Sequence, residues 1–550
     1  MSFVAAMSAP DLTKQGVKGS DVYTEAGVGD LRVSFFTMLV RGLGRAELTA
    51  QVNKFYEVWR RDPVQAKEYV RDLLVIAFQT RDVRGGKGER DLFYHILGAV
   101  CEKWPQWARE LVALIPEYGC WRDLWYMYTE YPTTRAAIDS VVKDQFMLDQ
   151  ETEHPSLLVK WLPREGSKYS SLAHHFAALL FPLTPAEKGQ RMRTYRRALA
   201  TLNRFADTTE IKMCGRTWST ITPSRVPGRL MKRCKHAFFN EKTVRARHGR
   251  ETVEPRYPGN TDREECAQHF RDHIQDVAEG RTVMKGATTT MPHEHVHELL
   301  HSRGALSSDA LSIIQAQWDA IRAEAAAGGG LGRLVAMCDF SGSMDGVPKE
   351  VSLALGILIS ELTSPAFRDH ILTFDSEPRW CSFAAAGCKT LADKVASIGT
   401  LGQGLSTDFQ KAADLILKKL VEHKVPREEA PADLLVLTDM GFDAACGGAH
   451  YGYNPKKNGW ETHFQMIRRN FEAAGYEAPR IVCWNLRAEY KDFHATAGEV
   501  GVVQLSGWSP AVLKALQSGG VQVETPYMGL RRLLDAPRYD AVRNVVAGLF

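Results

Sequence analysis

The spacing of hydrophobic and polar positions changes near the middle of this 550-residue chain. From Ser34 to about residue 324, apolar residues recur every three or four positions, as in Phe35, Leu39 and Leu43. This is the spacing of amphipathic helices. After residue 333, short apolar runs alternate with helical patterns, which is typical of a parallel sheet covered by helices. The pattern predicts a multidomain protein, with an N-terminal all-α helical-repeat solenoid followed by a C-terminal α/β doubly wound, Rossmann-like domain.

Composition along the chain predicts where these parts meet. Residues 1–30 are small, polar and Gly-rich, and we expect a poorly ordered N-terminus there. Short breaks such as Asp62-Pro63 and Gly85-Gly86 suit antiparallel helix pairs that stack into a solenoid. The run Ala325 to Gly332 is typical of a linker. We therefore expect a helical domain at 31–324, a linker at 325–332 and an α/β domain at 333–550.

Six apolar segments of the C-terminal part predict strands, because each is short and bounded by turn residues. A helical pattern from Val347 to Leu362 follows the first of them, and another helix is expected to end near His423. The predicted strands are Leu334–Cys338, His370–Phe374, Trp380–Phe383, Leu434–Thr438, Arg480–Leu486 and Val502–Leu505.

A polar motif directly follows the first predicted strand. Asp339, Ser341 and Ser343 are spaced two apart, so a carboxylate and two hydroxyls can point at one spot. Oxygen donors of this kind suit a hard cation such as Mg²⁺. The carboxyl ends of strands are also where open α/β sheets bind ligands. The motif therefore predicts a magnesium site.

The stretch Asp339-Phe-Ser341-Gly-Ser343 resembles the metal-ion-dependent adhesion site of von Willebrand factor A domains. The resemblance implies two further ligands downstream, Thr407 in a second loop and Asp439 after a buried strand. Asp408 is an alternative to Thr407, and Asp443 is a less favoured participant. Such a site implies a bound Mg²⁺ or another divalent cation, with one position left for an acidic group of a protein partner.

Composition narrows the class of protein. Hydrophobic residues make up 44% and charged residues 24% of the chain, as in ordinary soluble proteins. No apolar run is long enough to span a bilayer, and the first residues lack the pattern of a secretion signal. Ten cysteines occur without a CxxC pair, which favours reduced thiols. We expect a cytoplasmic protein that does not contact a membrane.

Basic residues are concentrated between Ala186 and Arg250, a segment that contains 17 Lys or Arg residues and only four Asp or Glu residues. A local excess of this size is typical of a nucleic-acid footprint, although a solvated helical face remains the alternative. A Gly-rich loop, Arg81 to Arg90, adds a second basic cluster. It is no Walker A loop, which needs Gly-x-x-x-x-Gly-Lys followed by Ser or Thr. Its glycines and cations suit phosphate contacts, or else a helix cap and turn.

This loop, with Ile115 to Gly119 and Trp121 to Leu124, resembles an uncharacterised family akin to the Ro/TROVE ribonucleoproteins. The resemblance extends from about residue 34 to the C-terminus. It implies a HEAT-like helical ring that binds structured or single-stranded small non-coding RNA, joined to a von Willebrand A domain, and we expect a monomeric ring. The residues predicted to contact RNA are Arg81, Arg84, Lys87, Arg90, Lys212, Arg229, Lys232 and Arg233.

A His-Glu-x-x-His stretch runs from His297 to His301. In a zincin helix this pattern supplies two zinc ligands and a general base. We identify no third ligand at a standard distance, and the related family begins a structural helix here with Pro-His-Glu. A zinc protease is therefore only a minor alternative, and we expect no stoichiometric zinc.

No nucleophile is paired with a positioned base in the sequence, so we expect no enzyme. The hypothesis is an RNA-binding ribonucleoprotein component with a Mg²⁺-dependent von Willebrand A domain. A metal-dependent protein-binding scaffold without an RNA role is the alternative. RNA that copurifies with the protein would favour the first, and a chelator-sensitive protein partner would favour the second.

Overall fold

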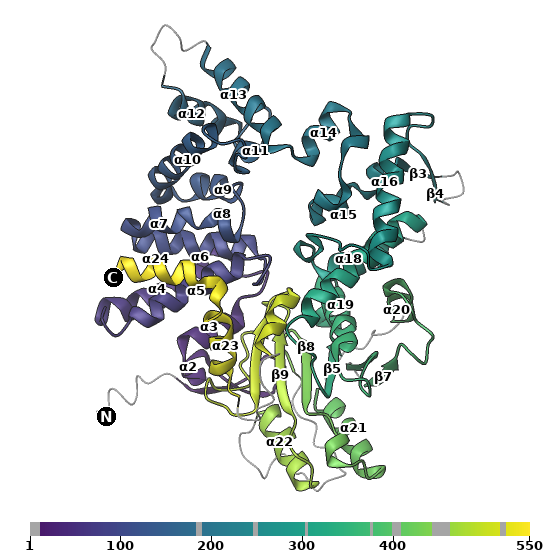
Figure 1. The fold of residues 1–550 in the computed structure, drawn as a ribbon. Helices are drawn as coiled ribbons and strands as arrows, with labels where there is room; N and C mark the ends of the chain where they lie inside the picture. Colours follow the sequence, from purple (N-terminus) through teal and green to yellow (C-terminus); the bar gives the residue numbers. More distant parts are fainter. Residues whose placement is uncertain are drawn as a thin grey trace. The chain divides into compact units, whose positions relative to one another are not determined.

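The chain folds into two compact units, which do not follow the linear order of the sequence (Figure 1). The structure is a computed structural model that describes residues 11–182, 190–245, 251–302, 306–374, 378–398, 409–442, 462–516 and 524–550. We call the first of the two compact units the sheet unit. It comprises Met1–Leu43, Ala287–Leu306 and Ile314–Ala536. The other is the helical unit, which comprises Gly44–Gly286, Ser307–Ile313 and Pro537–Phe550.

A six-stranded mixed sheet forms the centre of the sheet unit. Its order is β10-β9-β8-β5-β6-β7. Five strands are parallel, and β7 at the edge pairs antiparallel with β6. All six predicted strands are therefore confirmed to within a residue or two. They are β5 Leu334–Asp339, β6 His370–Phe374, β7 Arg379–Ser382, β8 Asp433–Thr438, β9 Arg480–Asn485 and β10 Val502–Ser506.

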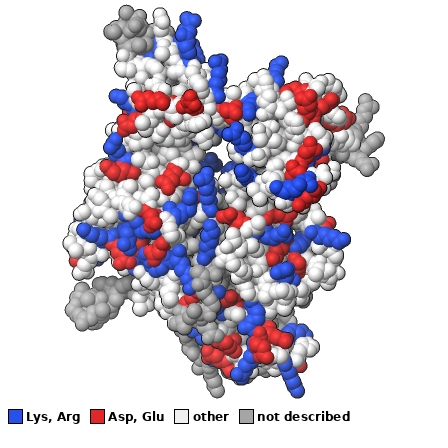
Figure 2. Space-filling view, viewed as in Figure 1, with Lys and Arg blue, Asp and Glu red and all other residues white. Residues whose placement is uncertain are grey.

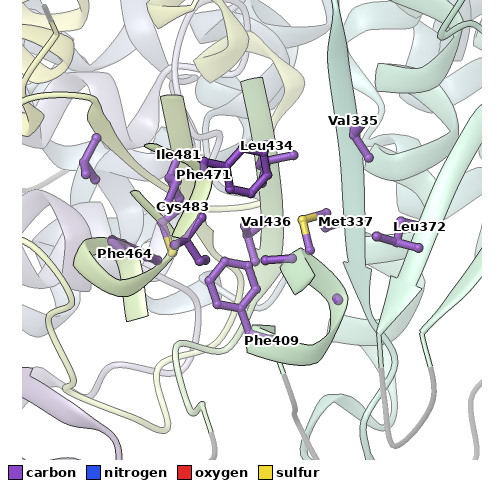
Figure 3. Close-up of a cluster of buried hydrophobic side chains, with 14 of the residues drawn as sticks. Val335, Met337, Leu372, Phe409, Leu434, Val436, Phe464, Phe471, Ile481 and Cys483 are labelled. Atoms are coloured by element: carbon purple, nitrogen blue, oxygen red, sulfur yellow. The ribbon is translucent and has the colours of Figure 1, made fainter. Parts of the chain in front are cut away.

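A cluster of buried apolar side chains joins one face of this sheet to two helices (Figure 3). The helices are α21, Phe409–Glu422, and α22, His463–Ala473. Alternate residues of each strand point to the same face, so Val335 and Met337 of β5 both enter the cluster. The other members labelled in Figure 3 are Leu372, Phe409, Leu434, Val436, Phe464, Phe471, Ile481 and Cys483.

Helix α19, Val347–Leu362, packs closely on β5 and has the bounds that the sequence predicts. Gly356 permits this approach, because a Cβ atom there would lie 2.4 Å from Sγ of Cys338. Helix α17, Pro292–His301, packs in turn on α19. The remaining helices of this unit are α20 Leu391–Ile398, α23 Pro526–Leu534 and most of α18 Ser308–Ala326.

The N-terminal segment belongs to the sheet unit. A hairpin of β1, Thr13–Gln15, and β2, Asp21–Tyr23, precedes α2, Glu25–Val28, and α3, Leu31–Met38. Its backbone is tied to a distant loop, since Tyr23 N donates to Phe493 O at 2.7 Å. Asn485 Nδ2 also donates to Thr37 O at 3.1 Å. The prediction that residues 1–30 are disordered is therefore wrong for residues 11–30. Short polar strands carry no pattern of their own, and tertiary hydrogen bonds hold them in place.

The helical unit consists mainly of consecutive, mutually contacting helices, which confirms the predicted helical N-terminal part. It also contains one hairpin, β3 Glu241–Arg245 with β4 Glu251–Pro255. Its helices are α4 Arg45–Arg61, α5 Lys67–Arg81, α6 Arg90–Lys103, α7 Ala108–Ala113, α8 Ile115–Tyr118, α9 Asp123–Glu130, α10 Arg135–Gln150, α11 Leu158–Trp161, α12 Ser170–Leu180, α13 Arg191–Ala206, α14 Thr209–Gly215, α15 Gly228–Phe238, α16 Thr261–Ala278 and α24 Asp540–Leu549.

The C-terminal helix α24 lies beside α5 and α7, where Figure 1 shows its yellow ribbon among blue and purple helices. Phe550 packs against Trp59 and Trp107. The predicted α/β domain at 333–550 therefore extends too far, because its last 14 residues belong to the helical unit. Residues 325–332 are likewise held in the sheet unit, where Leu331 N donates to Leu362 O at 3.0 Å.

Candidate metal centre

Sheet topology brings Asp339 and Asp439 together. Strands β5 and β8 are parallel neighbours, with Cys338 paired to Leu437. Each aspartate stands at the carboxyl end of its strand, so both carboxylates lie at the same edge of the sheet. Both residues are fully buried. This is the edge at which α/β sheets bind ligands, as the sequence predicts for the motif.

Hydrogen bonds hold the first carboxylate in place. The amide of Ser341 donates to Asp339 Oδ1 at 2.9 Å, and the hydroxyl of Thr438 donates to Asp339 Oδ2 at 3.0 Å. The hydroxyl oxygens of Ser341 and Ser343 lie 3.1 Å apart. The structure therefore gathers Asp339, Ser341 and Ser343 into one cluster of oxygen atoms.

The second carboxylate is only partly satisfied. Gly441 N donates to Asp439 Oδ1 at 3.0 Å, whereas the buried Oδ2 atom has no hydrogen-bond partner among the described residues. A buried carboxylate oxygen without a partner is costly. A cation bound at this oxygen would remove that cost, so the donor set fits a hard divalent ion.

Both carboxyl groups hold their protons more tightly than usual. Burial and the negative charge of Asp439 raise the pKa of Asp339 to about 7. Burial also raises the pKa of Asp439, although Ser343, Gly441, Lys18 and Arg487 oppose the shift. Two buried carboxylates at one point disfavour each other's ionised form. A divalent cation between them would reverse this effect by favouring the ionised form of both.

Two cationic residues that no sequence motif indicates also lie at this centre. Lys18 Nζ donates to Ser343 Oγ at 3.1 Å and lies 5.3 Å from the ring centroid of Tyr490. The Arg487 guanidinium donates to the main-chain oxygen of Ser343. Lys18 belongs to the hairpin loop between β1 and β2, and Arg487 follows β9. Neither residue lies in a motif, so only the fold identifies them.

Three further residues of the predicted centre lie outside the described part of the structure. They are Thr407, the predicted loop ligand, with its alternative Asp408 and the less favoured Asp443. The described centre accordingly consists of Asp339, Ser341, Ser343 and Asp439 with the neighbouring cations.

The Gly-rich loop folds back on helix α5. Lys87 N donates to Gln79 O at 3.0 Å and Glu89 N donates to Thr80 O at 2.8 Å. A Cβ atom on Gly86 would lie 1.8 Å from Gln79 O, so glycine is required for this approach. The loop is therefore a compact helix-to-helix connection.

Two of the predicted RNA contacts in this loop are wrong, because their side chains are buried. Arg81 forms a 2.7 Å ion pair with the buried Asp123. Lys87 is fully buried, and this burial, only partly opposed by Glu89, lowers its pKa well below the usual range. The other two residues, Arg84 and Arg90, are exposed. Residue type and spacing alone did not separate the inward cations from the outward ones.

The predicted residues of the basic segment are more accessible. Arg229 and Arg233 of α15 are exposed, while Lys232 is half-buried. Their spacing of three and four places them on one face of the helix. Lys212 is half-buried and pairs with Asp207 at 3.2 Å. On the face drawn in Figure 2, basic side chains are interspersed with acidic ones.

The histidines of the His-Glu-x-x-His stretch face a carboxylate from another helix. His297 Nδ1 lies 2.8 Å from Glu350 Oε2, and His301 Nε2 lies 2.8 Å from Glu350 Oε1. Glu350 is therefore a candidate third ligand, although it lies at no standard sequence distance from the two histidines. Glu350 lies in the first turn of α19, outside any motif, and helix packing supplies it.

Comparisons with known proteins assign no activity to these groups. A family described as "Domain of unknown function (DUF7788)" matches residues 333–530, which include the aspartates of the candidate centre but not Lys18 or His297. The chain is also 26% identical over 521 residues to "Uncharacterized protein L728" of Acanthamoeba polyphaga mimivirus. That alignment covers 89% of this chain and 82% of the viral protein.

Among the described helices, none combines the length and apolar character needed to cross a membrane.

Proposed function

We propose that the sheet unit is a von Willebrand A-type domain that binds a divalent cation, Mg²⁺ by preference, and uses it to hold an acidic group of a partner protein. Asp339, Ser341, Ser343 and Asp439 would hold the ion. The single observation that carries the proposal is the buried, partnerless Oδ2 atom of Asp439 beside a second buried carboxylate. Thr407 remains the proposed ligand from the loop before α21.

The charges around the centre support an acidic partner group. Two aspartates balance the two positive charges of the ion, and Lys18 and Arg487 add positive charge beside the centre, although Glu489 pairs with Arg487 at 2.8 Å. Positive potential of this kind attracts a carboxylate and strengthens its binding. The bound ion supplies electrostatic attraction and an exchangeable coordination position.

Cation-dependent stability tests the metal part of the proposal. The full chain freed of metal is titrated with Mg²⁺ and Mn²⁺ while thermal unfolding is followed. Binding to the folded state alone raises the unfolding temperature with ion concentration, and we expect Asp339→Ala with Asp439→Ala to abolish this rise. Asp345→Ala is the matched control, because Asp345 lies two residues after Ser343 but its side chain is 74% exposed. A wild-type protein that does not respond to either ion contradicts the proposal.

We propose RNA binding as a second function, carried by the helical unit. The supporting observation is the basic face of α15, where Arg229, Lys232 and Arg233 lie together. Helix α13 adds exposed arginines at positions 193, 196, 197 and 204, of which Arg196 pairs with Glu165 at 2.6 Å. Side chains of this kind contact phosphates without reading sequence. The proposed ligand is a small non-coding RNA, and a protein scaffold without RNA is the alternative. A salt titration of RNA binding to the full chain and its α15 variants tests the RNA role.

A further inference from the structure

We infer that His297, His301 and Glu350 form a second metal site, which binds a transition-metal ion of the Zn²⁺ class. The three residues belong to the sheet unit, with the histidines on α17 and the glutamate on α19. Two imidazoles and a carboxylate are a ligand set typical of zinc, and water would complete the coordination. This donor set differs from the oxygen-only centre at Asp339, so the two sites select different ions.

Helix geometry places both imidazoles on one side of α17. Residues four apart on a helix lie one above the other, and the ring centroids of His297 and His301 are 4.3 Å apart. The buried face of α17 is formed by other residues, among them His293 and Val296. His297 and His301 lie outside this buried face, so their imidazoles can turn to bind an ion together with Glu350.

Glu350 closes the site from the neighbouring helix. Its carboxylate contacts both rings, since His297 Nδ1 lies 3.0 Å from Oε1 and 2.8 Å from Oε2. One ligand atom from each residue can be chosen so that all lie within 4.8 Å of one another. Tetrahedral ligands bound at about 2.0–2.2 Å from one zinc ion would be about 3.4 Å apart. The imidazole–carboxylate distances of 2.8 Å are shorter than this, so a small separation of the carboxylate from each ring would admit the ion.

The exposure of the three groups suits an accessible ion. The side chains of His297 and His301 are 55% and 59% exposed, whereas that of Glu350 is only 11% exposed. The buried carboxylate provides a fixed anchor and negative charge. The exposed imidazoles leave an entry path from solvent and room for water on the metal.

Without an ion, the cluster would consist of two imidazole–carboxylate contacts. Such contacts do not require the three ligand atoms to surround one point. An ion would add a direct link between α17 and α19, and such coordination contributes to folding stability. The inference does not depend on the proposed Mg²⁺ function, because none of its three ligands belongs to that centre.

Metal titration of the full-length, untagged protein tests the site. After treatment with a chelator and dialysis, the protein is titrated with Zn²⁺ by calorimetry, and with Co²⁺ by its visible absorption. We expect one equivalent that is lost in the variant carrying His297→Ala and His301→Ala. We expect Glu350→Gln to weaken binding by more than the roughly 10–100-fold typical of losing a second-shell group, because it removes a direct ligand. Circular dichroism checks that each variant is folded.

Two control variants separate this site from other metal-binding groups. His423→Ala changes an exposed histidine in the same unit and should keep the full equivalent. Asp339→Ala with Asp439→Ala should also keep it, while the histidine variants should keep the response to Mg²⁺. Absence of a bound equivalent in the wild type, or an unchanged equivalent after both histidine substitutions, overturns the inference.

Discussion

The guanidinium of Arg538 binds the carboxylate of Asp82, 456 residues earlier in the chain. Arg538 Nη2 lies 2.8 Å from Asp82 Oδ1, and Nε donates to Oδ2. Asp82 is fully buried and also accepts from the amide of Arg84 at 3.0 Å. The aspartate thus caps the turn after α5 and fastens the C-terminal segment to the Gly-rich loop.

Substitution of Arg538 should destabilise the helical unit through this aspartate. Arg538→Ala leaves the buried carboxylate of Asp82 without its cation. Breaking a fully buried pair costs roughly 3–5 kcal/mol, and we expect about 2 kcal/mol because the Arg538 side chain is 33% exposed and partly screened. The measurement is chemical denaturation. Arg543→Ala on α24 is the control, because its partner Asp540 is 61% exposed; an equal loss in both variants contradicts the prediction.

Acid should destabilise the sheet unit through His494. Burial lowers the pKa of this histidine to about 4, although the main-chain oxygen of Met440 at 3.0 Å opposes the shift. Between pH 6.5 and 4 the unfolded chain therefore binds a proton that the folded chain does not. From pH 7 to pH 5 this linkage lowers the free energy of unfolding by about 2 kcal/mol. His494→Gln should remove that part of the pH dependence, and two identical pH profiles would disprove the assignment.

Binding of Mg²⁺ should weaken as the pH falls below about 7. Metal ligation requires ionised carboxylates, and the raised pKa of Asp339, about 7, means that this group is protonated in the ion-free protein at pH 6. A pKa of 7 leaves about one molecule in eleven ionised at pH 6 and about ten in eleven at pH 8, so the apparent affinity should fall about tenfold. Titration with Mn²⁺, followed by its paramagnetic resonance signal, measures the change. An affinity for Mn²⁺ that is equal at pH 6 and pH 8 would mean that Asp339 is not a ligand.

The sequence predicts those parts of the fold that depend on local pattern. Strand β5 is a short apolar run bounded by polar residues, and helix α19 follows it with apolar residues at helical spacing, so local pattern predicts both elements. The resemblance to von Willebrand A domains implies Asp439 as a partner of Asp339, and the structure brings the two together because parallel strands β5 and β8 end at the same edge. The agreement therefore covers the elements and the aspartates that sit directly at their ends.

Contacts between distant segments could not be predicted in this way. Lys18 reaches Ser343 from a polar hairpin, and Glu350 reaches His297 through the packing of two helices. Neither contact leaves a periodic signal in the sequence. The burial of Arg81 was missed for a related reason, because its partner Asp123 lies 42 residues further along the chain. The partners of a side chain depend on tertiary packing, and residue spacing in a single sequence does not reveal them.

Neutralising the basic face of α15 should weaken RNA binding and its salt dependence. Each lost phosphate contact should lower the slope of log affinity against log salt concentration by about one. We expect Arg229→Gln with Arg233→Gln to lower the slope by about two, and Arg84→Gln with Arg90→Gln to act in the same direction. The measurement is fluorescence anisotropy with a labelled small structured RNA at several salt concentrations.

Buried cations supply the decisive contrast for this prediction. Arg81→Ala should reduce the free energy of unfolding by roughly 3–5 kcal/mol, because it leaves the buried carboxylate of Asp123 without its cation. At temperatures where this variant is still folded, its salt slope should equal that of the wild type, since Arg81 reaches no phosphate. Asp339→Ala should likewise leave RNA affinity unchanged. If the variant with Arg229→Gln and Arg233→Gln binds RNA as the wild type does, α15 is not the RNA-binding face. Lys418 and Lys419 are exposed lysines of the sheet unit and serve as the charge control. If neutralising them weakens RNA binding as much as the α15 substitutions do, the attraction comes from total charge alone.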